Sequence, residues 1–220
     1  MRIEADGWCP QAARYESPNC DARPAGASVD LLVLHNISLP AGKFGGPHIA
    51  DLFTNRVDFH AHPSFADLRG LEVSAHFLVR RDGRVIQFVS CNDRAWHAGV
   101  SQFDGRDKCN DFSVGIEIEG SDFVAFSPAQ YESVAALTLA LLERYPLAGI
   151  QGHEHVAPGR KTDPGPYFDW EMLSNTLRKS AEKLPQKEAM LVTAHRPLGI
   201  LSALKNVKWP DPKLNEIFSV

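Results

Sequence analysis

The stretch Asp30-Leu31-Leu32-Val33-Leu34-His35 decides the fold of this chain. Four consecutive apolar residues between polar neighbours are typical of a strand buried on both faces, as in parallel sheets. His35 stands at the carboxyl end of this predicted strand, where such sheets open onto ligand-binding crevices. The stretch therefore predicts a central strand and marks His35 as a candidate functional residue.

A second strand is predicted at 113–119 because apolar and other residues alternate there. Ile116 and Ile118 fall on one side of this strand. Glu117 and Glu119 fall on the other, so the strand carries two carboxylates on a common face.

An antiparallel hairpin is predicted where residues 73–80 and 84–89 flank a glycine-containing turn at 81–83. Parallel and antiparallel pairing must then coexist in one sheet. The predicted fold class is α/β, with a mixed central β-sheet flanked by helices.

Two helices have clear start signals. Ser127 stands in the N-cap position before Pro128, with Gln130 in the capping-box place, and this helix ends near residue 145. Asp169 can cap a further amphipathic helix that runs to about residue 183. Both helices have apolar residues at helical spacing, so we expect them to pack on the sheet.

The rest of the chain gives weaker signals. The first thirty residues are predicted to be irregular, and the glycine-rich segment 38–70 contains one short helix that starts at Pro47. We expect segment 38–70 to act as a lid over a cleft. After Pro185 no element is predicted.

The run 152–166, Gly-His-Glu-His-Val-Ala-Pro-Gly-Arg-Lys-Thr-Asp-Pro-Gly-Pro, is predicted to be a loop because glycine and proline disfavour regular structure. His153 and Asp163 in this loop offer nitrogen and oxygen ligands that zinc accepts. His35 is the natural third ligand, and three protein ligands leave a fourth position for water, as in catalytic zinc sites. Residue chemistry alone leaves other histidines open as ligands: His60, His62, His76, His97 and His155.

Composition excludes several function classes. The net charge of −4 lacks the basic footprint of a nucleic-acid binder. No run approaches the roughly 20 apolar residues that cross a bilayer, and no signal peptide is visible at the first residues. The four cysteines form no C-x-x-C pair. We therefore expect a monomeric cytoplasmic protein with free thiols that binds neither nucleic acid nor membrane.

Several longer strings resemble the zinc-dependent N-acetylmuramoyl-L-alanine amidases, most closely the cytoplasmic AmpD type that acts on anhydro-muropeptides in cell-wall recycling. The resemblance covers approximately residues 7–177, in the same order as in that family. It rests on five strings: Leu-His-Asn-Ile-Ser-Leu-Pro at 34–40, Val-Ser-Ala-His at 73–76, Arg-Ala-Trp-His-Ala-Gly at 94–99, Gly-Ile-Glu-Ile-Glu-Gly at 115–120, and Ala-Pro-Gly-Arg-Lys-Thr-Asp-Pro-Gly-Pro at 157–166.

The resemblance implies a fold shared with peptidoglycan recognition proteins and zinc ligation by the same triad of His35, His153 and Asp163. It implies that Glu117 moves the proton of a water molecule whose pKa zinc lowers from ~15.7 towards ~7. It also implies that Lys161 stabilises the oxyanion that develops on the cleaved amide. Without the resemblance, Glu117 would be a surface carboxylate of its strand and Lys161 a solvated loop charge.

The resemblance further implies that Asn36, Trp96 and Asn110 contact sugar or peptide, although Trp96 could instead be a packing aromatic. The substrate would be a small muropeptide. Residues 1–183 would form the catalytic domain, and 184–220 an extension without a counterpart in the resemblance.

Two positions depart from the family pattern. Glu72 stands where relatives often carry arginine, which would alter binding of a substrate carboxylate. His155 is a spare imidazole two residues from a ligand, and it is either a bystander or a partner of the metal site. The alternative to an amidase is a catalytically inactive module that binds muropeptide or peptidoglycan, but such modules usually lose a ligand.

Overall fold

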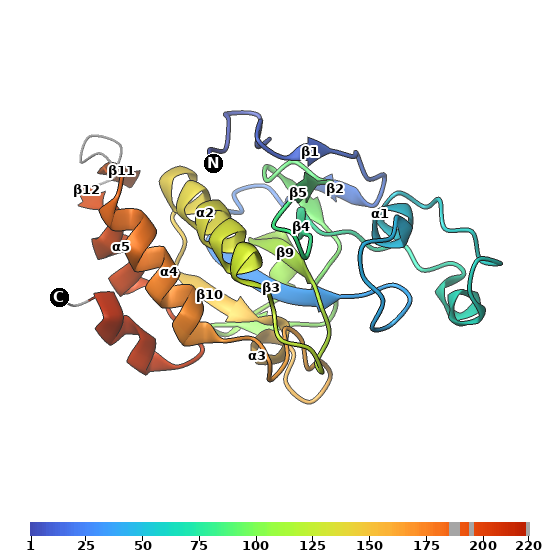
Figure 1. The fold of residues 1–220 in the computed structure, drawn as a ribbon. Helices are drawn as coiled ribbons and strands as arrows, with labels where there is room; N and C mark the ends of the chain where they lie inside the picture. The colour runs from blue at the N-terminus through green and yellow to red at the C-terminus, as the bar shows by residue number, and fades with distance from the viewer. Residues whose placement is uncertain (185–189, 194–195, 219–220) are drawn as a thin grey trace.

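The computed structural model describes residues 1–184, 190–193 and 196–218. Its centre is a six-stranded sheet, shown in Figure 1, with the order β1-β5-β4-β9-β3-β10. The strands are β1 (Ala13–Arg14), β5 (Val85–Gln87), β4 (Phe77–Val79), β9 (Ser113–Glu119), β3 (Leu31–Ile37) and β10 (Gly149–Gly152). β4 pairs antiparallel with β5, and the other pairings in this sheet are parallel. The predicted mixed sheet is confirmed.

The two strands predicted from the clearest patterns form the middle of the sheet. β3 begins at Leu31, and its first four residues are fully buried, as a continuous apolar run predicts. β9 has the predicted bounds and pairs with β3 over its whole length. The hairpin of β4 and β5 is also confirmed, although its strands are shorter than the predicted ranges.

Two long helices lie beside each other on one face of the sheet (Figure 1). α2 (Pro128–Arg144) begins with the predicted capping box between Ser127 and Gln130. α4 (Trp170–Glu182) begins at Asp169, whose carboxylate accepts the backbone N–H of Met172. Their apolar residues pack with those of β3 and β9 in the main hydrophobic core.

On the opposite face, segment 38–70 packs against β4 and the residues after β5. It contains α1 (His48–Phe53), whose N-cap is the predicted Pro47, and the 3-10 helix η1 (Pro63–Leu68). Ile49 and Phe53 of α1 pack with Leu78 of β4 in a second hydrophobic cluster. The helix therefore anchors an otherwise irregular segment to the sheet.

Several short elements escaped prediction because their pairing partners are remote in sequence. β1 is the sheet edge beyond β5, and β2 (Cys20–Ala22) pairs with β6 (Asp93–Ala95), so the first thirty residues are less irregular than predicted. β7 (Gln102–Phe103) pairs with β8 (Arg106–Asp107), and η2 (Cys109–Asp111) precedes β9. Strands of two or three residues leave no periodic signal.

The described residues after Pro185, where the sequence predicted no element, contain regular structure. They form β11 (Met190–Thr193), β12 (Arg196–Gly199), α5 (Ile200–Asn206) and η3 (Pro212–Phe218). Leu204 and Trp209 are buried in the main core. The backbone of Lys208 hydrogen-bonds Ala148 and Ile150, at the free edge of β10. None of the helices in the described ranges is long and apolar enough to span a bilayer.

Candidate metal centre and active site

Three neighbouring parallel strands bring the candidate residues to one edge of the sheet. His35 lies opposite Glu117 in the register of β3 and β9. On the other side of β3, Gly152 lies opposite Leu34, so His153 follows in the same row as His35. His153 begins the single helical turn α3 (His153–Val156), and after Gly152, the last residue of β10, this turn is the only regular structure in the loop predicted at 152–166. The sheet register itself aligns His153, His35 and Glu117.

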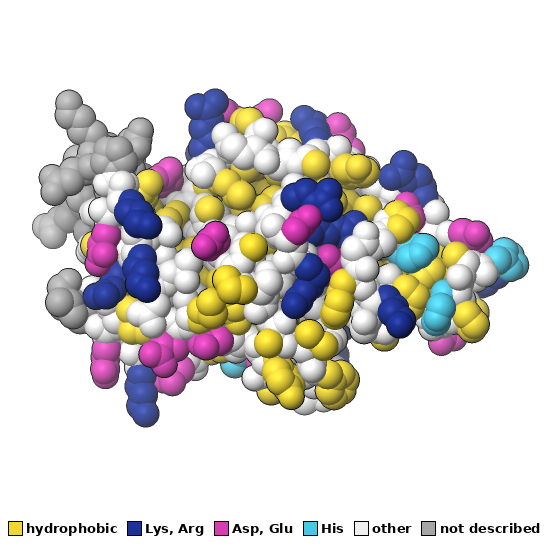
Figure 2. Space-filling model, viewed as in Figure 1, with side chains coloured by type: hydrophobic (Ala, Val, Ile, Leu, Met, Phe, Trp, Pro, Cys, Tyr) yellow, Lys and Arg dark blue, Asp and Glu magenta, His cyan; other side chains and the backbone are white. Residues whose placement is uncertain are grey.

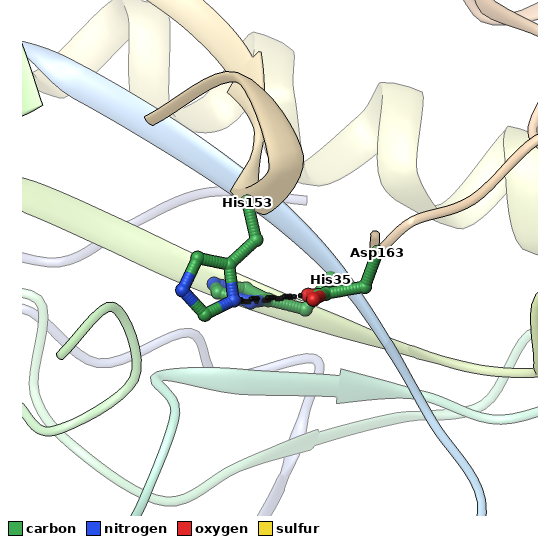
Figure 3. Close-up of side chains that lie close together, drawn as sticks. All are labelled: His35, His153 and Asp163. Carbon is green, nitrogen blue, oxygen red and sulfur yellow. Dashed lines mark hydrogen bonds and ion pairs between the residues drawn. The ribbon is translucent and has the colours of Figure 1, made fainter. Parts of the chain in front are cut away.

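Asp163 reaches this row from the loop after α3 (Figure 3). Its Oδ2 lies 2.9 Å from Nδ1 of His35 and 3.1 Å from Nδ1 of His153. The two Nδ1 atoms lie 3.0 Å apart. Among the described residues this triad is the one group of three whose ligand atoms all lie within 4.8 Å and could hold a metal ion.

The chemistry of these donors fits a cation. Nε2 of His153 lies 3.0 Å from the carbonyl oxygen of Ala98, which can only accept, so a neutral His153 carries its proton there. Its Nδ1 is then a bare lone pair that faces the carboxylate oxygen of Asp163. Lone pairs at such distances repel unless a positive charge lies between them. In a tetrahedral zinc site, zinc–ligand distances of about 2.0–2.1 Å place the ligand atoms about 3.3 Å apart. The three distances between the ligand atoms of the triad are close to this value.

The electrostatics keep the triad in the form that a metal requires. Burial lowers the pKa of His35 to about 4, although contact with Asp163 opposes this shift. Burial would raise the pKa of Asp163, but the contacts with His153 and His35 outweigh it and hold that pKa below its ordinary value. At neutral pH the site therefore offers the neutral imidazole of His35 and the carboxylate of Asp163.

Glu117 lies beside the triad with an unused oxygen. Its Oε2 is buried and has no hydrogen-bond partner among the described residues. Burial raises the pKa of Glu117 well above its ordinary value, the negative charge of Asp163 raises it further, and the ammonium of Lys161 lowers it. A buried carboxyl without a partner costs free energy, so its retention suggests a role in chemistry.

Lys161 is exposed and lines a cleft of about 690 Å³ beside the triad. Its walls are formed by polar and apolar residues from the end of β3 and from three loops, among them Asn36, Ser38, Asp122, Phe123, Arg160, Lys161 and Asp163. A cavity of similar volume, about 680 Å³, runs along β5 and the residues near Pro47, and none of the candidate site residues lines it. The cleft at the triad is therefore the candidate substrate site.

The three predicted substrate contacts have different surroundings. Both amide hydrogens of Asn36 are used inside the protein, on Asp122 and on the carbonyl of Pro164, so only its oxygen remains for a substrate. The indole N–H of Trp96 donates to Asp21. Trp96 and Asn110 are not among the residues that line the cleft, and their substrate contacts stay predictions.

The other histidines do not join the triad. His76 is fully buried and accepts the backbone N–H of Gly115. His155 accepts the backbone N–H of Gly152, which stabilises the turn at α3 and accounts for this departure from the family pattern. His60 and His62 belong to segment 38–70, and Figure 2 shows histidine side chains at that end of the molecule. His97 contacts His35 on the ring nitrogen that faces away from Asp163, because Nδ1 of His97 lies 3.0 Å from Nε2 of His35.

Asp122 is a site residue that the sequence did not indicate. Its carboxylate accepts hydrogen bonds from Asn36 and Thr162, and it packs against Gly165, where a Cβ would lie 2.5 Å from its Oδ1. These contacts join the loop after β9 to the loop that carries Asp163. No pattern in the sequence marks such a contact, because it joins two loops forty residues apart.

Comparison with known proteins identifies close relatives. The chain is 52% identical over 180 residues to the 1,6-anhydro-N-acetylmuramyl-L-alanine amidase AmpD of Citrobacter freundii, with 81% of this chain and 96% of that protein covered. It is 55% identical over 166 residues to AmpD of Escherichia coli (strain K12), with 74% and 91% covered. The crystal structure of a selenomethionine AmpD derivative matches with a TM-score of 0.78 and 52% identity, over 80% of this chain and 99% of that one.

A family model described as N-acetylmuramoyl-L-alanine amidase matches residues 25–166, a range that contains β3, β9, α3 and the whole triad. The identities extend the match over nearly the full length of the relatives. This chain belongs to the N-acetylmuramoyl-L-alanine amidase family, in its AmpD type.

Proposed function

We propose that this chain is a zinc hydrolase that cleaves the amide bond between N-acetylmuramic acid and L-alanine of muropeptides. One water molecule is consumed, the lactyl carbonyl becomes a carboxylic acid, and the peptide leaves with a free amino group on L-alanine. The observation that carries the proposal is the convergence of three metal-ligand atoms beside a buried carboxyl oxygen that has no partner in the described part of the chain.

His35, His153 and Asp163 would hold the zinc ion. Bound there, zinc would supply Lewis-acid chemistry, which makes water more acidic and polarises a carbonyl group. The burial of His35 and His153, which are 1% and 2% exposed, keeps competing solvent away from the ligand nitrogens.

Glu117 is the proposed general base and acid. Its raised pKa brings the carboxyl closer to neutral pH, where it can take a proton from water and return it to the departing alanine nitrogen. Lys161 keeps part of the Glu117 population ionised, because its ammonium stabilises the carboxylate. The same ammonium at the cleft wall would attract the negative charge that develops on the carbonyl oxygen.

We propose the 1,6-anhydro form of N-acetylmuramic acid as the substrate. The support is that the relatives more than 50% identical to this chain bear that name. The role would be recycling of soluble cell-wall fragments by a cytoplasmic monomer. Size-exclusion chromatography with light scattering should give a mass near 24.3 kDa, and a dimer mass would contradict the monomer.

The decisive experiment compares two substrates with one enzyme preparation. Purified zinc-loaded protein should release a peptide with free L-alanine from anhydro-muropeptide, seen by mass spectrometry, and should act far more slowly on intact sacculi. Chelation or Asp163→Ala should abolish turnover. Binding of muropeptide without cleavage would favour an inactive recognition module instead, and full activity of the metal-free protein would sink the mechanism.

We further propose that residues 1–183 carry the catalytic machinery and that the extension from 184 serves stability. In support, Trp209 is 4% exposed, stacks on Phe218 and donates to the carbonyl of Leu204. Trp209→Ala should lower the free energy of unfolding by about 3–5 kcal/mol and leave kcat unchanged at a temperature where the variant is folded. A large loss of kcat in the folded variant would assign the extension a catalytic role.

A further inference from the structure

The segment of residues 97 and 98 contacts both histidines of the triad at Nε2, the ring nitrogen that faces away from Asp163. Nε2 of His35 lies 3.0 Å from Nδ1 of His97, and Nε2 of His153 lies 3.0 Å from the carbonyl oxygen of Ala98. The two contacts come from consecutive residues, although His35 and His153 lie 118 positions apart in the sequence. One segment therefore controls the orientation of two ligands.

The segment is itself fixed by Asn110. Its Oδ1 accepts the backbone N–H of His97 at 3.2 Å and that of Ala98 at 2.8 Å. Arg160 holds the other side, because its guanidinium donates to the carbonyl oxygens of Ala98 and Val100. The position of the segment thus depends on side chains from η2 and from the loop that carries Asp163.

The ring of His97 occupies a place that only glycine on β9 leaves open. A Cβ at Gly115 would lie 2.6 Å from Cγ of His97, far closer than carbon atoms approach. On its other side, Nε2 of His97 lies 3.2 Å from Oγ of Ser113. The ring is therefore fixed between β9 and His35.

We infer that residues 97 and 98 form one positioning segment that holds both histidine ligands with Nδ1 toward the metal, and that Asn110 holds this segment in place. A histidine that binds a metal through Nδ1 carries its proton on Nε2, so it needs an acceptor there. Nδ1 of His97 is that acceptor for His35, and the Ala98 carbonyl is that acceptor for His153. The proton of His97 then lies on Nε2, where Ser113 Oγ accepts it.

This inference rests on the proposed metal site, and it gives Asn110 a role other than the predicted contact with substrate. His97 and Asn110 are positioning residues, since neither is needed to touch the substrate. The readout is therefore metal affinity, measured by competition of zinc against a chromogenic chelator. The absorption spectrum of the cobalt-substituted protein reports the ligand geometry independently of turnover.

His97→Phe keeps the volume of the ring but removes the acceptor, so we expect a loss of about 10- to 100-fold in zinc affinity and an altered cobalt spectrum. His97→Asn places an amide oxygen near the position of Nδ1 and should restore most of the affinity. His60→Phe is the matched control, because His60 is exposed on segment 38–70 and its replacement should leave the affinity unchanged.

Asn110→Leu should weaken zinc binding by a similar factor, and Asn110→Asp should retain it because a carboxylate oxygen still accepts both N–H groups. If Asn110 contacts substrate instead, Asn110→Leu will raise KM while zinc affinity stays at the wild-type value. Thermal unfolding of the metal-free variants separates lost affinity from lost structure. Gly115→Ala, which displaces the His97 ring without removing it, should lower zinc affinity as well.

The outcomes are distinct. Wild-type affinity in both His97→Phe and Asn110→Leu, with unchanged cobalt spectra, would overturn the positioning role and leave the proposed function intact. Failure of the wild-type protein to bind zinc would overturn the proposed function and this inference together. A loss in His97→Phe that His97→Asn restores supports the role assigned here.

Discussion

The two regions at the carboxyl end of β9 differ sharply although they lie two residues apart. In the hairpin region Glu119 is 1% exposed and fully partnered, with hydrogen bonds from Arg80, from the backbone of Arg81 and from the backbone of Gly45. In the metal region Glu117 keeps a buried oxygen that no described residue hydrogen-bonds. Both carboxylates are on the same side of the strand, so alternation does not tell them apart.

The difference in hydrogen-bond partners separates a structural carboxylate from a candidate for chemistry. A buried carboxylate surrounded by donors ties segments together, and Glu119 joins segment 38–70 to the hairpin of β4 and β5. A buried carboxyl that lacks donors lowers stability, so selection for stability alone would remove it. The unsatisfied oxygen of Glu117 beside the metal-ligand atoms is therefore the ground on which we propose that Glu117, and not Glu119, acts on a substrate.

The largest effect should come from Glu117→Gln. The amide has nearly the same shape as the carboxyl but cannot take up a proton, so kcat should fall by about 10²- to 10⁴-fold. Zinc content, measured by atomic absorption, should stay near one per chain. Loss of metal from this variant would make Glu117 a ligand rather than a proton carrier and would break the comparison.

Glu119→Ala should show the opposite pattern. It leaves the guanidinium of Arg80, 11% exposed, without its anion, so the free energy of unfolding should fall by about 3–5 kcal/mol. Urea denaturation measures this loss, and kcat per folded molecule should remain within about twofold. A stable but inactive Glu119→Ala protein would contradict the division between the two regions.

Lys161→Met tests whether a charge at the wall of the cleft contributes to the chemistry of the metal region. It removes an ammonium that stabilises charge near Glu117, so kcat should fall by about 10²- to 10³-fold, as for loss of one oxyanion-stabilising group. Because Lys161 is exposed, the free energy of unfolding should change by no more than about 0.5 kcal/mol. An unchanged kcat would show that Lys161 is a solvated loop charge without a role in the reaction.

The smallest effect is a pH-dependent gain in stability for Glu117→Gln in the metal-free protein. Burial raises the pKa of Glu117, so above its ordinary value of 4.5 the unfolded chain loses a proton that the folded chain keeps. The free energy of unfolding of the wild type therefore falls as pH rises through this window. The glutamine variant has no such group and should be more stable by about 1–3 kcal/mol at pH 7.

Near pH 4 that difference should vanish, because the carboxyl is then protonated in both states. Urea denaturation of both proteins at the two pH values measures it. Equal stabilities at pH 7 would show that Glu117 has a partner after all.

Local sequence signals predicted most of the regular structure. The apolar run at β3, the alternation at β9, and the caps at Ser127 and Asp169 are all confirmed. Each depends on residues within one turn or one strand, where the side chains that matter are close in sequence. β10 and the elements after residue 190 escaped because they are short and are stabilised by partners remote in sequence.

The sequence by itself determined the central strands, the capped helices and the residue types from which a metal site could be built. It proposed His35, His153 and Asp163, and the family resemblance singled out Glu117. The sequence could not bring the three ligand atoms within 3.1 Å of one another, nor show that Glu117 and Glu119 differ in their hydrogen-bond partners. Only the tertiary structure decided those points. The parallel register aligns His153, His35 and Glu117, and Arg80, Asn110 and His97 approach from other segments. The physical reason is that backbone preferences are local, whereas burial and hydrogen-bond partners are set by contacts between distant parts of the chain.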